Sequence, residues 1–77
     1  MKETYYAELD AESNNYIRLI KIEEADNSGK TAYLYDLNLC KWIPSKYFTE
    51  FNFDKKFYDE LSEDVASTLI SRWKKNL

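Results

Sequence analysis

The side chains that most often perform acid–base chemistry near neutral pH are scarce in this chain. Its 77 residues include no histidine and a single cysteine, Cys40. Histidine is the usual general acid or base at this pH, and imidazole and thiolate groups are the usual ligands of zinc. Cys40 lies between Leu39 and Lys41 and has no histidine to activate it as a nucleophile. We therefore interpret Cys40 as a partly buried thiol in a turn or strand.

Carboxylates are the remaining candidates for chemistry, and the densest group is Asp59, Glu60, Glu63 and Asp64. A calcium loop has acids at alternating positions and a central glycine, and this run has neither feature. The acids precede an apolar helical pattern instead, where the helix dipole favours negative charge. A chain with one glycine also has no glycine-rich phosphate loop. The sequence predicts no enzyme, no metal site and no cofactor.

The composition indicates one small domain that relies on aromatic residues for its core. Residues 1–77 are expected to form a single domain without a disulfide or zinc staple. Seven Tyr, four Phe and two Trp supply 17% of the chain, and each buried ring removes roughly 150–250 Å² from water. The lone thiol favours a reducing compartment, and the charged first residues and short apolar runs give no export or membrane signal. We expect a soluble cytoplasmic protein and no membrane partner.

Alternation of apolar and polar residues predicts strands over residues 4–9, 16–23, 31–36 and 41–43. Turns are expected at residues 26–29, which contain the only glycine, and at residues 37–40. Pro44 is expected to stop the fourth strand. In the second strand the apolar phase slips between Leu19 and Ile20. Either both faces of that strand are covered, or a bulge re-aims it.

Helical spacing predicts a helix over residues 63–75. Ser62 is a suitable N-cap, and Leu61 and Ala66 occupy the positions of a hydrophobic staple. The apolar stripe of this helix consists of Val65, Ala66, Leu69, Ile70 and Trp73. We expect Ser45 to cap a short helical turn through Tyr47 and Phe48, and Asp54 to cap another through Phe57, Tyr58 and Leu61.

These elements together predict an α+β fold. Its sheet is an antiparallel meander of three to four strands, and the C-terminal α-helix packs on one face of that sheet. The helix hides its apolar stripe on the sheet, and the sheet hides one face under the helix.

Part of this pattern resembles a string found in other small proteins. Tyr33-x-Tyr35-Asp36, Lys41-Trp42-Ile43-Pro44 and Tyr58-x-x-Leu61-Ser62-Glu63-x-x-Ala66 follow one another over roughly the last 45 residues. The string is similar to that of small uncharacterised proteins of low-GC Gram-positive bacteria and their phages and mobile elements. Members commonly have Gly before the Lys-Trp pair, where this chain has Leu39-Cys40. The resemblance implies a bacterial or phage accessory protein and no activity.

Protein binding is the function that remains, because the aromatic residues exceed what one small core must hide. Spare Tyr and Trp side chains are typical interface anchors. The candidate partner-binding residues are Trp42, Tyr47, Phe48, Phe51 and Phe53; the alternative is that these rings fill the space between sheet and helix. A candidate acidic surface, suited to covering the basic groove of a nuclease, consists of Glu8, Asp10, Glu12, Glu23, Glu24 and Asp26.

Two alternatives to a protein-binding accessory or inhibitor stay open. A nucleic-acid-binding regulator would use the basic residues Arg72, Lys74 and Lys75 at the end of the chain. We do not expect direct nucleic-acid binding, because the first two strands are net acidic and phosphate neutralisation supplies most of the affinity in such complexes. A structural homodimer would pair an edge strand of the meander across a two-fold axis.

Overall fold

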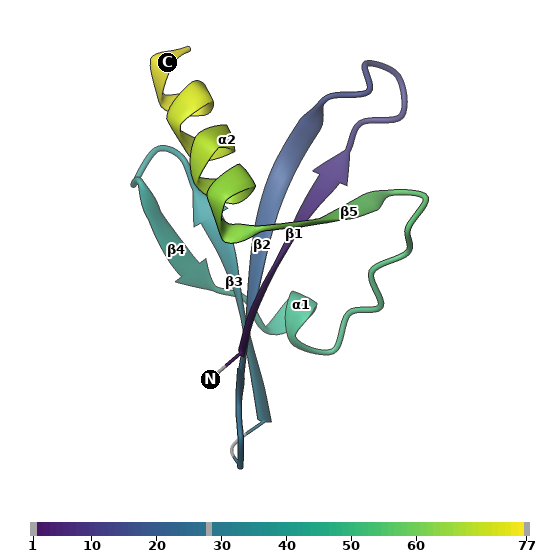
Figure 1. Cartoon of the computed structure of the whole chain (residues 1–77), viewed down its shortest axis with the longest axis vertical. Coiled ribbons are helices and arrows are strands. Elements are labelled where there is room, and N and C mark those ends of the chain that lie inside the picture. The colour runs from purple at the N-terminus through teal and green to yellow at the C-terminus, as the bar shows by residue number, and fades with distance from the viewer. Residues whose placement is uncertain (1, 28, 77) are drawn as a thin grey trace.

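The computed structural model describes residues 2–27 and 29–76, which form a sheet and two helices (Figure 1). The elements in chain order are β1 Lys2–Leu9, β2 Tyr16–Ala25, β3 Gly29–Asp36, β4 Lys41–Pro44, α1 Lys46–Thr49, β5 Tyr58–Leu61 and α2 Glu63–Lys75. The predicted α+β class, the meander and the C-terminal helix are confirmed. The four predicted strands are present, and β1, β2 and β3 each extend two residues further at one end.

The sheet has five strands in the order β4-β3-β2-β1-β5, and all neighbours are antiparallel. The first four strands form the meander, and β5 returns to pair with the outer edge of β1. The prediction of an Asp54-capped helical turn through Leu61 is therefore wrong. Asp54 instead shapes a turn, since its carbonyl accepts bonds from the Phe57 and Tyr58 amides at 3.0 Å. Pairing with Tyr5–Glu8 then holds Tyr58–Leu61 extended, which shows tertiary contacts overriding local propensity.

β2 is buried on both of its faces. Leu19 and Ile20 are adjacent in sequence and both are 0% exposed, although they point to opposite sides of the sheet. The apolar phase slip therefore has the first of the two causes that the sequence allowed, since both faces are covered and the β1–β2 register is continuous through Leu19 and Ile20. A bulge is also present but lies earlier in the strand, where a register shift leaves Ile17 as the extra residue between Tyr16 and Arg18.

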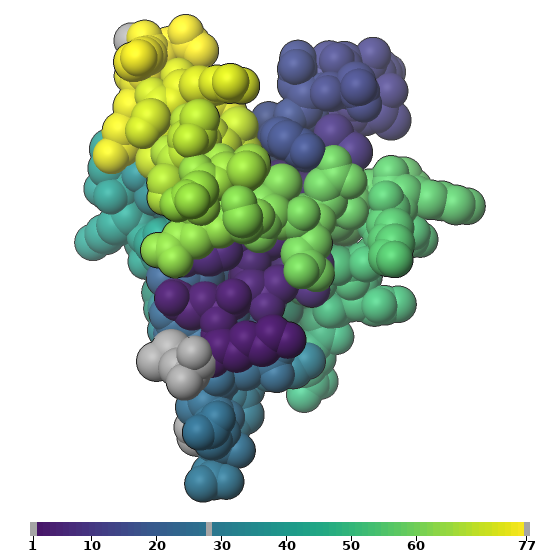
Figure 2. Space-filling view, viewed as in Figure 1, coloured from purple at the N-terminus to yellow at the C-terminus, as the bar shows by residue number. Residues whose placement is uncertain are grey.

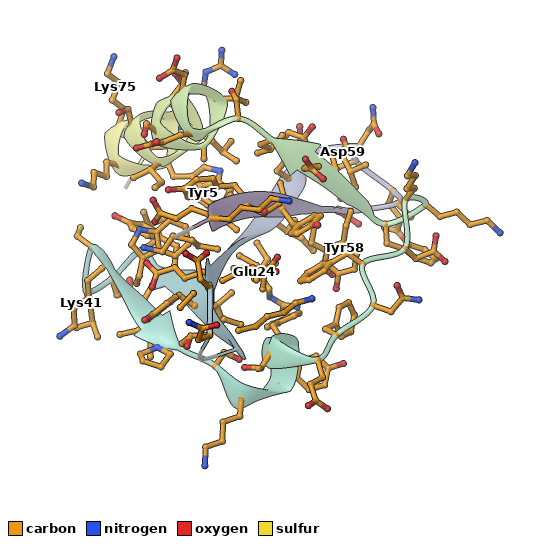
Figure 3. All side chains as sticks on the ribbon, turned by 60° about the horizontal axis from the view of Figure 1, so that its bottom comes forward. Tyr5, Glu24, Lys41, Tyr58, Asp59 and Lys75 are labelled. Atoms are coloured by element: carbon orange, nitrogen blue, oxygen red, sulfur yellow. The ribbon has the colours of Figure 1, made fainter. Side chains whose placement is uncertain are left out.

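The two faces of the sheet carry separate halves of the core. On the α2 side, Leu19 packs with Tyr5, Ala7 and Ala66. On the α1 side, Ile20 packs with three buried residues, Ile22, Ala32 and Phe48. Figure 3 shows this division, because Tyr5 and Asp59 lie toward α2 while Tyr58 and Glu24 lie toward α1 and the loop after it. The chain therefore has two small hydrophobic clusters, one on each face of the sheet, instead of one large core.

α2 begins and ends as its sequence predicts. The Ser62 Oγ accepts a hydrogen bond from the Val65 amide at 3.2 Å, which satisfies one free donor of the first turn. Leu61 and Ala66 both belong to the cluster on the α2 side, as expected of a staple. Val65 departs from the predicted stripe, since it is 49% exposed and the buried position belongs to Ala66. α1 is also confirmed, but the side chain of Ser45 makes no capping bond.

The predicted turns lie at residues 26–29 and 37–40, although Ser28 falls outside the described residues. Gly29 has a φ of 80°, a conformation that glycine adopts without strain. In the second turn Cys40 has a φ of 53° and is exposed, which corrects the expectation of a partly buried thiol. Neither described helix has the length and apolar character needed to cross a membrane.

The turn at Cys40 predicts that glycine would stabilise the protein. A left-handed conformation costs an L-residue about 1–2 kcal/mol, whereas glycine loses only about 0.5–1 kcal/mol of extra backbone entropy. We expect Cys40→Gly to raise the free energy of unfolding by about 0.5–1 kcal/mol in urea titrations. Cys40→Ala is the control, because it removes the thiol and keeps the strained Cβ. Equal stability of the two variants would contradict this account.

Candidate functional site

The residues with potential chemistry do not converge in the described part of the chain. Within residues 2–27 and 29–76, no group of three or more His, Cys, Asp or Glu side chains is placed to hold a metal ion. Asp59 and Glu60 point to opposite sides of β5, and Glu63 lies in the first turn of α2. Cys40 lies on the exposed turn before β4, where its Sγ donates to the Leu37 carbonyl at 3.4 Å.

The predicted partner-binding residues lie on two different sides of the sheet. Trp42 packs on the α2 side, whereas Phe48, Phe51 and Phe53 belong to the cluster on the α1 side. Phe48 is buried and belongs to the core. Of this set Tyr47 is the most exposed, at 72% of its surface. The five residues therefore form no single surface.

Trp42 instead helps to enclose Lys21 in the middle of the α2 side. The Lys21 Nζ lies 4.9 Å from the Trp42 ring centre and 5.0 Å from the Tyr33 ring centre. The same nitrogen lies 3.4 Å from a carboxylate oxygen of Glu23 and 3.8 Å from one of Glu3. The positive charge of Lys21 therefore offsets the repulsion between Glu3 and Glu23, which face each other in the β1–β2 ladder.

The predicted acidic residues are also dispersed. Glu8 and Glu24 lie on the α1 side, and Glu8 accepts a bond from Arg18 at 2.7 Å. Glu23 lies on the α2 side. Asp10 and Glu12 belong to the β1–β2 connection, and Asp26 belongs to the β2–β3 turn at the opposite end of the molecule (Figure 1). The structure does not gather these acids on one face.

The sheet splits where β2 begins. The β2–β3 ladder runs from Ala25↔Gly29 to Ile20↔Leu34, so residues 16–19 of β2 have no register partner on β3. Figure 1 shows β1 and β2 leading to one side at this end, while β3 leads to the other side behind α2. Figure 2 shows a hollow between the end of α2 and the β1–β2 connection.

A cavity of about 360 Å³ occupies the split, and we call it the β2–β3 groove. Residues 16–19 form its β2 wall, and Leu34, Tyr35, Leu37 and Trp73 form the rest of its lining. Ile17 is 54% exposed at its mouth. A second hollow of about 310 Å³ adjoins the groove at Tyr16 and reaches Val65, Leu69 and Arg72 of α2.

Backbone directions show that β2 presents a free edge to this groove. Alternate residues of an antiparallel strand direct their N–H and C=O groups to opposite neighbours. The Ser45 amide donates to the Ala32 carbonyl at 2.8 Å, so Ala32 faces β4 and Tyr33 faces β2. Lys21, the partner of Tyr33, therefore faces β3, and so does Leu19 two residues earlier. The β2–β3 ladder stops at Ile20, so the Leu19 amide points toward β3 without a residue in register opposite it.

Tyr16 holds the β2 wall of the groove in place. Its hydroxyl donates to Asp59 Oδ2 at 2.8 Å and so connects the start of β2 to β5. This hydrogen bond to a carboxylate, together with burial, raises the pKa of Tyr16 above its ordinary value. Burial likewise raises the pKa of Tyr5, Tyr6 and Tyr58.

Sequence reasoning missed most of the groove. Its residues are ordinary core and strand types, and the split depends on where the β2–β3 ladder stops. The phase slip at Leu19 and Ile20 signalled that both faces of β2 are covered, but it marked neither the bulge at Ile17 nor the end of the β2–β3 ladder. Comparisons of the chain with protein-family models, curated proteins and solved structures found no match. Any function must therefore be inferred from the geometry.

The raised tyrosine pKa values predict alkaline destabilisation. A phenol whose pKa is higher in the folded state contributes stability that is fully present below pH 10 and is lost as the pH rises through the folded-state pKa. We expect urea unfolding to show a falling free energy above about pH 10. Tyr16→Phe is expected to lower the free energy of unfolding by about 1 kcal/mol at pH 7. At high pH this variant should lose less stability than the native chain. An equal alkaline loss in both proteins would contradict the role of the Tyr16–Asp59 bond.

Proposed function

We propose that this chain is a non-catalytic protein-binding module whose binding surface is the β2–β3 groove. It acts as an accessory or inhibitor protein by occupying a surface of its partner. The observation that carries the proposal is the split itself, which leaves an apolar cavity and a free strand edge open at one end of an otherwise paired sheet. Exposed apolar surface bordered by polar residues is typical of interaction sites.

The lining of the groove has the character of an interface core. Tyr16, Tyr35 and Trp73 supply broad aromatic surfaces, and such residues dominate binding energy where they have been measured. Ile17 in the groove and Val65 in the adjoining hollow add aliphatic surface that is about half exposed. Burying such aliphatic surface against a partner would stabilise a complex by roughly 25 cal/mol per Å².

The outer edges of the sheet favour the groove over edge pairing as the place of contact. Both edge strands have only four residues. β4 ends in Pro44, and β5 carries Asp59 and Glu60. Short strands that carry proline or charge resist pairing with a second chain. These features support a partner in the groove in preference to a homodimer formed through β4 or β5.

Affinity capture with matched variants tests this function. Ile17→Asp places a charge in the groove, and Tyr47→Asp makes the same kind of change at an exposed ring of α1, on the other side of the sheet. Both positions are exposed, so we expect each variant to fold, as circular dichroism would show. One protein should be captured equally by the native chain and by Tyr47→Asp, and about tenfold less by Ile17→Asp.

The opposite pattern would contradict the groove. Capture that survives Ile17→Asp and is lost in Tyr47→Asp would return binding to the aromatic surface predicted from the sequence. Failure of the native chain to capture any protein above the blank matrix, in lysates of the source cell, would contradict the protein-binding function itself.

A further inference from the structure

The free edge of β2 is suited to a partner in extended conformation. Residues 16–19 have no register partner on β3, and at about 3.3 Å per residue they span roughly 13 Å. An added strand supplies its own N–H and C=O groups to such an edge, which is a recurrent mode of peptide recognition. A helix satisfies its backbone groups internally and would leave the amide of Leu19 without a partner.

The two sides of the split differ in chemistry. Tyr16, Leu19 and Tyr35 lie on the α2 side, where Trp73 of the helix packs against the same cluster. Arg18 lies on the α1 side, as its pairing opposite Glu8 places it. Among the described residues that line the groove, Arg18 alone is charged. A strand placed along β2 would thus present alternate side chains to an aromatic surface and to a cation.

Arg18 retains the capacity to bind a second carboxylate. Its NH1 group contacts Glu8 Oε1 at 2.7 Å, and its side chain is 45% exposed. A guanidinium carries five N–H donors, so one ion pair leaves others free. Glu8 does not line the groove. Arg72 adds a second cation beside the adjoining hollow, together with Asp64.

We propose that the β2–β3 groove binds an extended segment of another protein in which aliphatic and acidic side chains alternate. The segment adds a strand to the free edge of β2, its aliphatic side chains contact Tyr16 and Trp73, and its carboxylates contact Arg18. This inference rests on the proposed function and names the chemistry of the partner at the same site.

Selection from a phage-displayed library of random peptides on the immobilised full chain tests this inference. We expect enriched peptides to alternate aliphatic residues with Asp or Glu. Synthetic copies should bind Arg18→Gln about tenfold more weakly than the native chain, as expected for loss of one charged contact at an interface. The control Lys46→Gln removes an exposed cation on α1 and should change affinity less than twofold. Chemical shift changes on binding should centre on the amides of residues 16–19.

Three outcomes would overturn the strand model. They are enriched peptides with helical spacing, affinities that Arg18→Gln leaves unchanged, and shift changes confined to residues outside the groove. Absence of any enriched peptide, while a captured protein still depends on Ile17, would also overturn the strand model and leave the protein-binding function standing. Peptide binding without any captured protein would support the strand site and contradict the function.

Discussion

The double burial of β2 is the constraint on which the rest of the structure depends. Leu19 and Ile20 are both inaccessible to solvent and lie on opposite sides of one strand. A single helix covers only one face of a sheet, so burying both residues needs a second cover. α2 supplies the first cover, and α1 with Phe51 and Phe53 supplies the second. The aromatic richness of the chain follows from this, because each cover is short and large rings must fill the space beneath it.

One end of the sheet is open because the β2–β3 ladder stops at Ile20. Between residues 20 and 24, β2 has register partners on both β1 and β3. Beyond Ile20 the bulge at Ile17 locally increases the twist and turns β2 away with β1. β3 remains with β4 and leads into the turn at residues 37–40. The groove is the space that these two halves leave, and the aromatic residues at its border are those that serve the α2 side of the core.

The fold was largely predictable from sequence because most of its signals are local. The alternation in β1 and β3, the glycine at residue 29 and the cap at Ser62 each act within a few residues. β5 was missed because Asp59 and Glu60 have little intrinsic preference for a strand, and only pairing with β1 makes them one. The candidate site was less predictable for the same reason. Trp42 was predicted to be an interface anchor, but its ring packs against the Lys21 ammonium group and the Tyr35 ring within the protein. Nothing in the sequence indicated that Arg18 and Ile17 would be exposed beside a groove.

Amide hydrogen exchange of the free protein, resolved by NMR, tests the central claim most directly. The account holds that β2 has fully buried side chains at Leu19 and Ile20 but pairs in register with β3 only from Ile20 onward. It predicts that the amide of Lys21, which lies opposite Tyr33, exchanges slowly, while the amide of Leu19 exchanges much faster despite its fully buried side chain. Equal protection of the two amides would show that the split is closed in solution and would contradict the account.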